Sequence, residues 1–215
     1  MSRKRTVVLI SGRGSNMTAL IAAASDPAYP AEIVGVISDR ANAAGLAIAQ
    51  ARGIPTKVIV RADYASKEAH DGAIDAALIG FGAEIVALAG YMRILGARFV
   101  EKWLGRMVNI HPALLPAFKG LDTHARALRA GMRIHGCTVH FVTLDMDDGP
   151  IIAQAAVPVM VGDNERIRWP RGCSRPSTGS IRWRSDWSPK ARRAWRRATP
   201  CSRISPTMRR TAPRW

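Results

Sequence analysis

Short runs of β-branched and other apolar residues alternate with alanine-rich segments over most of the chain. Runs bounded by turn-forming residues predict strands at 5–11, 32–38, 56–60, 84–90 and 106–110. Apolar residues at helical spacing predict helices over 16–24, 43–52, 66–80 and 95–103. Strands that alternate with helices indicate an α/β, Rossmann-like fold, with a mostly parallel, twisted sheet and helices on both faces.

Two further apolar runs, at 137–143 and 151–159, differ from the others in how they are connected. Only "LDMDDGP" separates them, which is too short for the helical crossover that parallel strands need. We therefore expect an antiparallel C-terminal hairpin at this edge of the sheet.

The composition is that of one globular domain. The chain has 215 residues, 47% of them hydrophobic, which is enough to bury a core without disulfides. Its apolar runs are shorter than the roughly 18 residues of a membrane-spanning helix, and the apolar stretch near the N-terminus is too short for a signal peptide. Three cysteines show no metal-ligand spacing. We expect a cytoplasmic protein without a metal.

The net charge of +16 is concentrated at one end of the chain. Residues 1–165 carry 17 Lys or Arg against 15 Asp or Glu, whereas residues 166–215 carry 15 against one. This last segment has five of the six tryptophans and no leucine, valine or phenylalanine. We expect it to add nothing to the core, and we place the domain at 1–163 and an atypical basic tail at 164–215.

A shift of reading frame near Glu165 would explain the tail. Codons for Trp and Cys, and most for Ser, begin with T, and in a shifted frame that base becomes the middle base of a codon for an apolar residue. Positions marked in this way recur mostly at helical spacing: Trp169, Cys173, Ser174, Ser177, Ser180 and Trp183. The alternatives are a disordered basic tail and a nucleic-acid-binding arm. Sequencing the gene decides, because an unbroken frame that encodes this tail would exclude the shift.

A glycine-rich turn, "SGRGSNM" at 11–17, joins the first predicted strand to the first helix. Glycines allow the free N–H groups at a helix start to approach an anion, and Ser15 and Asn16 add capping capacity and donors. Met17 replaces the third glycine of a dinucleotide-binding motif, although Asp39 stands at a suitable distance for one. We favour a single phosphate monoester over a pyrophosphate; the alternative is a capped structural turn.

Asn109 and His111 come at the end of the predicted strand that Pro112 terminates. Residues two apart on a strand face the same side, and ligands of parallel sheets bind at the carboxyl ends of strands. An amide there can donate to a developing oxyanion, and a histidine can exchange a proton near neutral pH. The alternative for His111 is a structural histidine.

The hairpin turn supplies carboxylates that could hold this histidine in its charged form. They are Asp145, Asp147 and Asp148, whose alternative role is a solvated turn. His140, on an apolar strand, is interpreted as a satisfied core residue.

Taken together, these motifs resemble the phosphoribosylglycinamide (GAR) formyltransferase family of purine biosynthesis, which uses 10-formyltetrahydrofolate. The matching stretches are "VVLISGRGSNMTAL", "AGYMRIL", "MVNIHPALLPAFKGLDTHARAL", "HGCTVHFVT" and "DMDDGPIIAQAAVPV". They cover residues 6 to about 163 in order. The resemblance implies the formyltransferase fold, with a phosphate-binding N-terminal half and a folate-binding C-terminal half. After the "VPV" strand the family continues with a helix and a strand, patterns that the tail lacks.

The resemblance also implies the site residues. His111 aligns with the general acid, Asp147 with the carboxylate that keeps it protonated, and Asn109 with a group that reaches the formyl oxygen. GAR-binding residues would be Gly14, Ser15 and Asn16. Folate-binding residues would be Lys67, Met92, Arg93, Ile94, Leu95, Asn109, Thr143, Leu144, Asp145, Met146 and Asp147. The family usually has arginine where Lys67 stands, and Asp148 replaces a small residue.

By the same resemblance the substrates are small molecules, with 10-formyltetrahydrofolate as co-substrate, no metal, no membrane and no nucleic acid. A monomer or homodimer is expected. Two relatives share the Asn-x-His…Asp arrangement: formyltetrahydrofolate hydrolase needs no phosphate turn, and methionyl-tRNA formyltransferase carries a further C-terminal domain. A further alternative is a catalytically impaired product with a nucleic-acid-binding basic tail, whose affinity for nucleic acid would fall steeply with salt.

Overall fold

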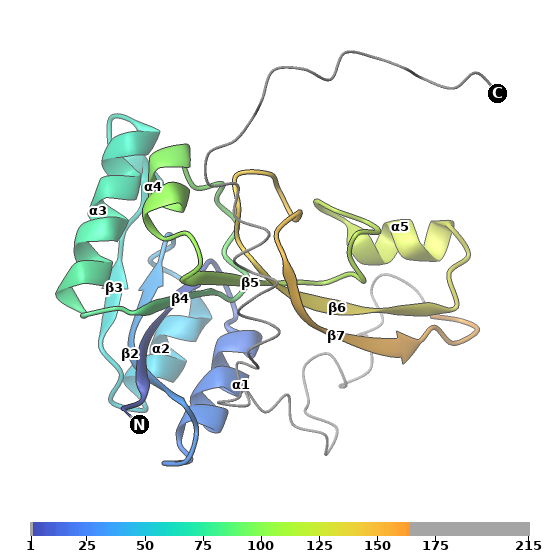
Figure 1. Ribbon diagram of the computed structural model, residues 1–215, viewed down its shortest axis with the longest axis horizontal. Helices are drawn as coiled ribbons and strands as arrows, with labels where there is room; N and C mark the ends of the chain where they lie inside the picture. Colours follow the sequence, from blue (N-terminus) through green and yellow to red (C-terminus); the bar gives the residue numbers. More distant parts are fainter. Residues whose placement is uncertain (1, 164–215) are drawn as a thin grey trace, which may run out of the picture. The chain divides into compact units, whose positions relative to one another are not determined.

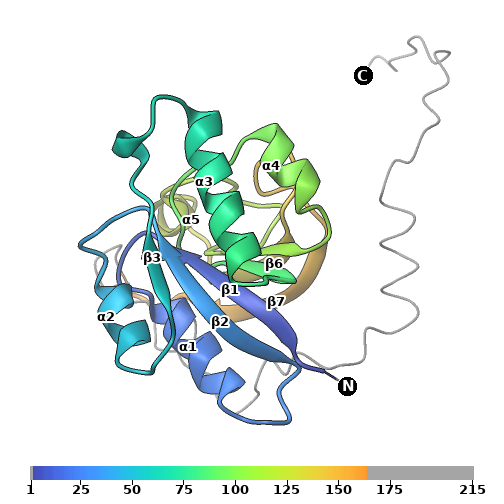
Figure 2. The same cartoon turned by 90° about the vertical axis from the view of Figure 1, so that its left-hand side faces the viewer.

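The computed structural model describes residues 2–163, which form a seven-stranded sheet with helices on both faces (Figures 1 and 2). The sheet has the order β3-β2-β1-β4-β5-β6-β7. Its strands are β1 (Lys4–Ile10), β2 (Ala31–Ser38), β3 (Thr56–Val58), β4 (Ile85–Leu88), β5 (Met107–His111), β6 (Ile134–Phe141) and β7 (Ile151–Pro158). The tail predicted at 164–215 lies outside the described residues.

The predicted mixture of parallel and antiparallel pairing is confirmed. β1 to β5 pair in parallel, whereas β5–β6 and β6–β7 pair antiparallel. Consequently β1, β4 and β5 end at the same edge of the sheet. Since neighbouring strands lie about 4.8 Å apart, the ends of β1 and β5 are separated laterally by only about 10 Å. This edge brings together the three segments that the sequence marks for chemistry.

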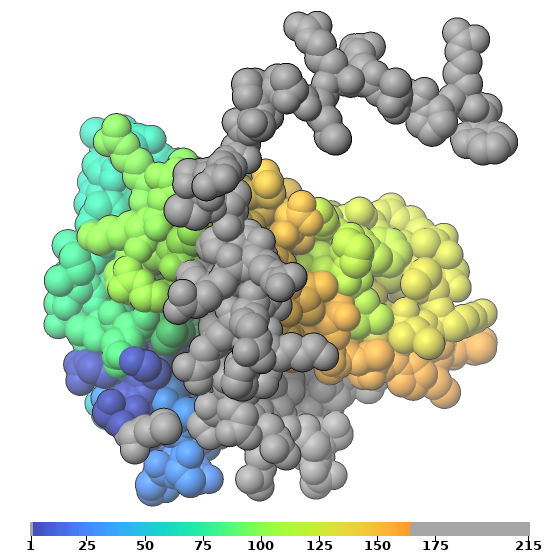
Figure 3. Space-filling view, in the orientation of Figure 1, coloured from blue at the N-terminus to red at the C-terminus, as the bar shows by residue number. Residues whose placement is uncertain are grey.

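The helices divide between the two faces of the sheet. In Figure 2, α1 (Ser15–Ala24) and α2 (Ala44–Gln50) cover one face, and α3 (Lys67–Gly80) and α4 (Ala97–Lys102) cover the other. Figure 3 shows the surfaces of α3 and α4 on the left of the molecule and those of α5 (Thr123–Arg129), β6 and β7 on the right. This two-sided layering is the one that the alternation of strands and helices predicts.

The core between α3, α4 and the sheet follows from helical periodicity. His70, Ile74, Ala77 and Leu78 recur at spacings of three and four, and all are buried on the inner face of α3. Ser66 begins this helix, because its hydroxyl accepts the N–H of Ala69. The buried side chains that complete the cluster come mainly from the strands and α4: Val7, Leu9, Ile37, Ile59, Val86, Leu95, Phe99, Val100, Trp103 and Met107.

Two helical elements of the structure are not predicted by the sequence patterns. The helix α5 has seven residues and buries only two of them, Thr123 and Ala127. The 3₁₀ turn η1 (Arg61–Asp63) buries none. Segments with so little apolar periodicity carry no signal that distinguishes them from loops. Strands β3 and β4 are also shorter than the runs from which they were predicted.

Candidate functional site

The side chains of Asn109 and His111 are connected through two residues of the adjacent hairpin. His111 Nδ1 lies 3.3 Å from Asp147 Oδ2, Asp147 Oδ1 lies 3.6 Å from His140 Nε2, and His140 Nε2 lies 3.2 Å from Asn109 Nδ2. We call these four residues the Asn–His–Asp–His cluster. The predicted contact between His111 and Asp147 is therefore present, although 36 positions separate the two residues.

The ring of His111 has an acceptor at each nitrogen. Nδ1 faces the Asp147 carboxylate, and Nε2 lies 3.0 Å from the backbone carbonyl of Phe118. Since a carbonyl oxygen only accepts, Nε2 carries a proton and donates it to Phe118. The residue is only 4% exposed. The two ring nitrogens of His111 therefore face a carboxylate and a carbonyl inside the protein.

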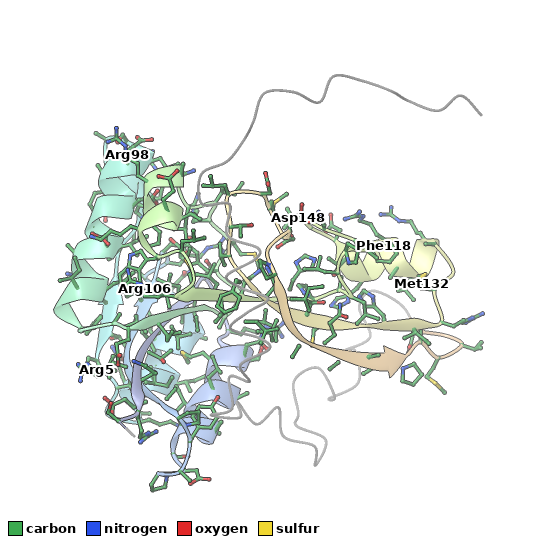
Figure 4. The ribbon with its side chains drawn as sticks, in the orientation of Figure 1. Arg5, Arg98, Arg106, Phe118, Met132 and Asp148 are labelled. Atoms are coloured by element: carbon green, nitrogen blue, oxygen red, sulfur yellow. The ribbon has the colours of Figure 1, made fainter. Side chains whose placement is uncertain are left out.

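The position of the Asp147 carboxylate is fixed by its own backbone conformation and by a hydrogen bond from the facing loop. Its φ of +53° places it in the left-handed region, which Asp tolerates better than most residues. Its Oδ2 also accepts the Gly120 N–H at 2.9 Å. Asp148, by contrast, pairs with Lys119 Nζ at 2.6 Å. Figure 4 shows Asp148 and Phe118 on the two loops that approach each other here. Of the three acidic residues in the turn, Asp147 alone has an ion pair to His111 among the described contacts.

His140 is the functional candidate that sequence analysis missed. It was interpreted as a satisfied core residue, and it is indeed 2% exposed, but one of its partners is Asn109. Its Nδ1 donates to the Phe141 carbonyl at 2.9 Å. Burial lowers the pKa of the His140 imidazole, although the Phe141 carbonyl and Asp147 act in the opposite direction. The antiparallel register pairs Asn109 directly with His140, and no local pattern of the sequence indicates that register.

The glycine turn begins α1 without a side-chain cap. Gly14, with φ +71°, is the N-cap residue, so the expectation that Ser15 or Asn16 caps the helix is wrong. A Cβ on Gly14 would lie 3.0 Å from the Gly45 backbone and 3.1 Å from the methyl group of Met17. Met17 is fully buried, so it fills the space beneath the turn. Ser15 and Asn16 lie at the surface end of the helix.

The carboxylate of Asp39 pairs with an arginine inside the protein rather than facing a site for a ribose. Its carboxylate accepts from Arg93 Nε at 3.0 Å, and the side chain of Asp39 is 1% exposed. The dinucleotide alternative needs this group at the surface for a hydroxyl. The buried contact and the bulk of Met17 together argue against that alternative.

The segment after β4 has the exposed apolar side chains expected of a binding surface. Met92 and Ile94 are 63% and 75% exposed, whereas Leu95 is buried in the core and offers only its backbone. The Ser11 hydroxyl accepts the Met92 N–H at 2.8 Å, which ties this segment to the glycine turn. Lys67 lies beside it, since its Cε is 3.8 Å from the place of a Cβ on Gly96.

The turn between β6 and β7 presents a second exposed apolar pair. Leu144 and Met146 are 60% and 61% exposed. Thr143 donates through its hydroxyl to the carbonyl of Asp145 at 3.2 Å, which shapes the turn. Large exposed apolar side chains on two loops that flank polar groups are typical of a ligand-binding surface.

Within residues 2–163, no three His, Cys, Asp or Glu side chains form a group that could hold a metal ion. No helix in the same range is long and apolar enough to cross a membrane.

Comparison with known proteins identifies relatives over most of the chain. Residues 4–167 match the family model described as formyl transferase. The phosphoribosylglycinamide formyltransferase of Escherichia coli K12 is 45% identical over 159 residues, which cover 74% of this chain and 75% of that protein. The trifunctional purine biosynthetic protein adenosine-3 of Homo sapiens is 52% identical over 171 residues, which cover 77% of this chain but only 17% of that protein.

Solved structures give the same result. The phosphoribosylglycinamide formyltransferase from Brucella melitensis has a TM-score of 0.73 and 60% identity, over 75% of this chain and 83% of that chain. A formyltetrahydrofolate deformylase from Pseudomonas syringae has a TM-score of 0.69 and 27% identity, over 75% of this chain and 53% of that chain. The fold, the matched family model and the identity of these relatives agree: the chain belongs to the formyl transferase family.

Proposed function

We propose that the chain transfers a formyl group from 10-formyltetrahydrofolate to the amine of phosphoribosylglycinamide, a step of purine biosynthesis. The Asn–His–Asp–His cluster at the carboxyl ends of the strands is the observation that carries the proposal. Relatives at 45% and 60% identity are named for this activity.

The phosphate end of the nucleotide is assigned to the glycine turn. The N–H groups of Ser15 and Asn16 stand in the first turn of α1, whose dipole favours an anion. Gly14 permits the approach because its backbone lies in the left-handed region and a side chain there would meet Gly45 and Met17. These three residues, Gly14, Ser15 and Asn16, are the proposed nucleotide-binding residues.

The folate is assigned to the surface formed by the segment after β4 and the turn after β6. Met92, Ile94, Leu144 and Met146 would cover the apolar faces of the pterin. Backbone groups of Arg93, Leu95 and the turn from Thr143 to Asp147 would satisfy its polar edge. Lys67 and the half-exposed guanidinium of Arg93 supply positive charge nearby, which suits the carboxylates of a folate tail.

The cluster accounts for the chemistry of transfer. The substrate amine attacks the formyl carbon, a C–N bond forms, and the carbonyl electron pair moves to oxygen. Asn109 and the protonated His111 stabilise that oxyanion, and Asp147 keeps His111 charged. Collapse of the intermediate breaks the bond from carbon to the folate nitrogen, which takes a proton as the amine loses one. Binding of both reactants at adjacent sites would lower the entropic cost of the encounter.

His111 must change one hydrogen bond for this chemistry. Its Nε2 proton is directed at the Phe118 carbonyl, 3.0 Å away. When substrates bind, the same proton is shared with, or passes to, the substrate oxygen. Catalytic hydrogen bonds of free enzymes commonly reach their final geometry only in the complex.

An assay of formyl transfer tests the proposal. The full chain is incubated with 10-formyltetrahydrofolate, with and without phosphoribosylglycinamide, and both the released folate and the formylated nucleotide are quantified. Folate release that depends on the amine, with an equal amount of formylated nucleotide, is the expected result. Absence of the formylated product would refute the proposed function.

Formyltetrahydrofolate hydrolysis is the second candidate, and the structural neighbour named as a deformylase favours it. Water would then accept the formyl group, and folate release would be independent of the nucleotide. The glycine turn favours a phosphorylated acceptor instead. We extend the proposal to a cytoplasmic enzyme, because the relatives are named for purine biosynthesis. The proposed oligomeric state is a monomer or homodimer.

A further inference from the structure

We propose that His140 is a positioning residue that orients the Asn109 amide, so that the NH₂ group of Asn109 faces the reacting carbonyl. The inference rests on the proposed function for its kinetic consequence but not for its structural content. Asn109 and His140 are direct partners across β5 and β6, and their side chains meet at 3.2 Å.

The protonation of His140 follows from its other nitrogen. Nδ1 lies 2.9 Å from the Phe141 carbonyl, which can only accept, so the ring proton of neutral His140 is on Nδ1. Nε2 is then an acceptor. An acceptor requires a donor opposite it, and the Asn109 side chain meets this requirement with its nitrogen rather than its oxygen.

The neutral form of His140 is consistent with its surroundings. The ring is 2% exposed, and burial lowers its pKa, against the effects of the Phe141 carbonyl and the nearby Asp147. The adjacent His111 adds to the lowering of the His140 pKa. A neutral His140 does not compete with His111 for an ion pair with the Asp147 carboxylate.

Orientation matters because an amide has two unlike ends. With one N–H bonded to His140, the second N–H of Asn109 is free to donate to the formyl oxygen. If the amide rotates by half a turn, its carbonyl oxygen faces the developing oxyanion and repels it. Loss of one oxyanion donor typically costs about 10²–10³ in turnover, and loss of its orientation should approach the same cost.

Two substitutions separate orientation from packing. The glutamine side chain of His140→Gln is long enough to place its amide oxygen near the position of Nε2, where it can accept from Asn109. The shorter asparagine side chain of His140→Asn reaches only the position of Nδ1, so it leaves Asn109 without this acceptor. We expect His140→Gln to retain turnover within about tenfold of wild type and His140→Asn to lose about 10²-fold. The KM for both substrates should change little, since the affected contact forms in the transition state. Equal losses in the two variants, or a smaller loss in His140→Asn, would overturn the proposal.

A double-mutant cycle with Asn109→Ala supplies the second test. If His140 acts through Asn109, adding His140→Asn to Asn109→Ala should reduce turnover by less than about threefold, because residues that act as a unit are not additive. Losses that multiply would show that His140 acts independently of Asn109 and would overturn the inference.

Nuclear magnetic resonance tests the structural content without any activity. In the ¹⁵N-labelled full chain at neutral pH, His140 should be neutral, with its proton on Nδ1 and a bare Nε2. A proton on Nε2 would overturn the inference even in an active enzyme. If formyl transfer is absent while this tautomer is present, the proposed function fails and the positioning of Asn109 stands.

Discussion

Asp147→Asn removes the negative charge beside His111 and leaves the shape of the side chain unchanged. Two unit charges 3.3 Å apart attract by about 1.3 kcal/mol at a dielectric constant near 80 and by about 5 kcal/mol near 20. The side chains of His111 and Asp147 are only 5% and 11% exposed, so the upper half of this range applies. We expect turnover to fall about 10²–10³-fold, which corresponds to about 2.7–4 kcal/mol.

Steady-state formyl transfer with both substrates varied measures this effect. Asparagine tolerates a positive φ as well as aspartate does, so the turn should keep its conformation and the melting temperature should change little. Asp148→Asn is the matched control, since it removes the same charge from the same turn and should change turnover by only a few-fold. Turnover of Asp147→Asn near that of wild type, or an equal loss in Asp148→Asn, would refute the assignment.

Three further predictions concern contacts outside the cluster. Asp39→Ala removes a charge-assisted hydrogen bond to Arg93 and should lower the free energy of unfolding by about 1.5–3 kcal/mol in urea titrations; an unchanged midpoint would contradict this. The Lys119–Asp148 pair is half-exposed, so Lys119→Ala should cost at most about 1 kcal/mol in thermal unfolding, and the charge-swapped double variant should recover it. Burial lowers the pKa of His135, so the unfolded chain binds a proton there before the folded chain does. The contribution of neutral His135 to the free energy of unfolding is therefore fully present above about pH 6.5, and below that pH it falls by up to about 1.4 kcal/mol per pH unit. When the free energy of unfolding is measured against pH, the His135→Gln variant should lose less stability on acidification than the wild type.

The sheet was predictable because its signals are local. A strand such as β4 is a continuous apolar run, and α3 repeats its apolar residues at helical spacing, so each element shows its type within a short window. The seven-residue link between the last two strands was enough to predict their antiparallel pairing. The short helix α5 was missed because only two of its residues are buried.

In the candidate site, local pattern alone predicts that Asn109 and His111 share a face, because they stand two apart on one strand. Asp147 was selected among three acidic residues only through the family resemblance, since its contact with His111 depends on a left-handed backbone that no local pattern indicates. His140 is a buried, hydrogen-bonded residue, as its apolar strand predicts, but that pattern does not say which residues are its partners. The register between β5 and β6, which no local pattern fixes, gives it Asn109 as a neighbour. The helix start at Gly14 was likewise set by packing against Gly45 rather than by the capping residues beside it.

In the Asn–His–Asp–His cluster, one carboxylate lies beside two histidines whose other partners differ. His111 and His140 are both almost fully buried and both face Asp147. The difference lies in the remaining partners: His111 meets a carbonyl at its second nitrogen, whereas His140 meets a carbonyl at one nitrogen and an amide donor at the other. Burial lowers the pKa of the His140 imidazole, and these two partners fit a single proton on Nδ1. The same carboxylate therefore lies beside two rings whose other hydrogen-bond partners differ in kind.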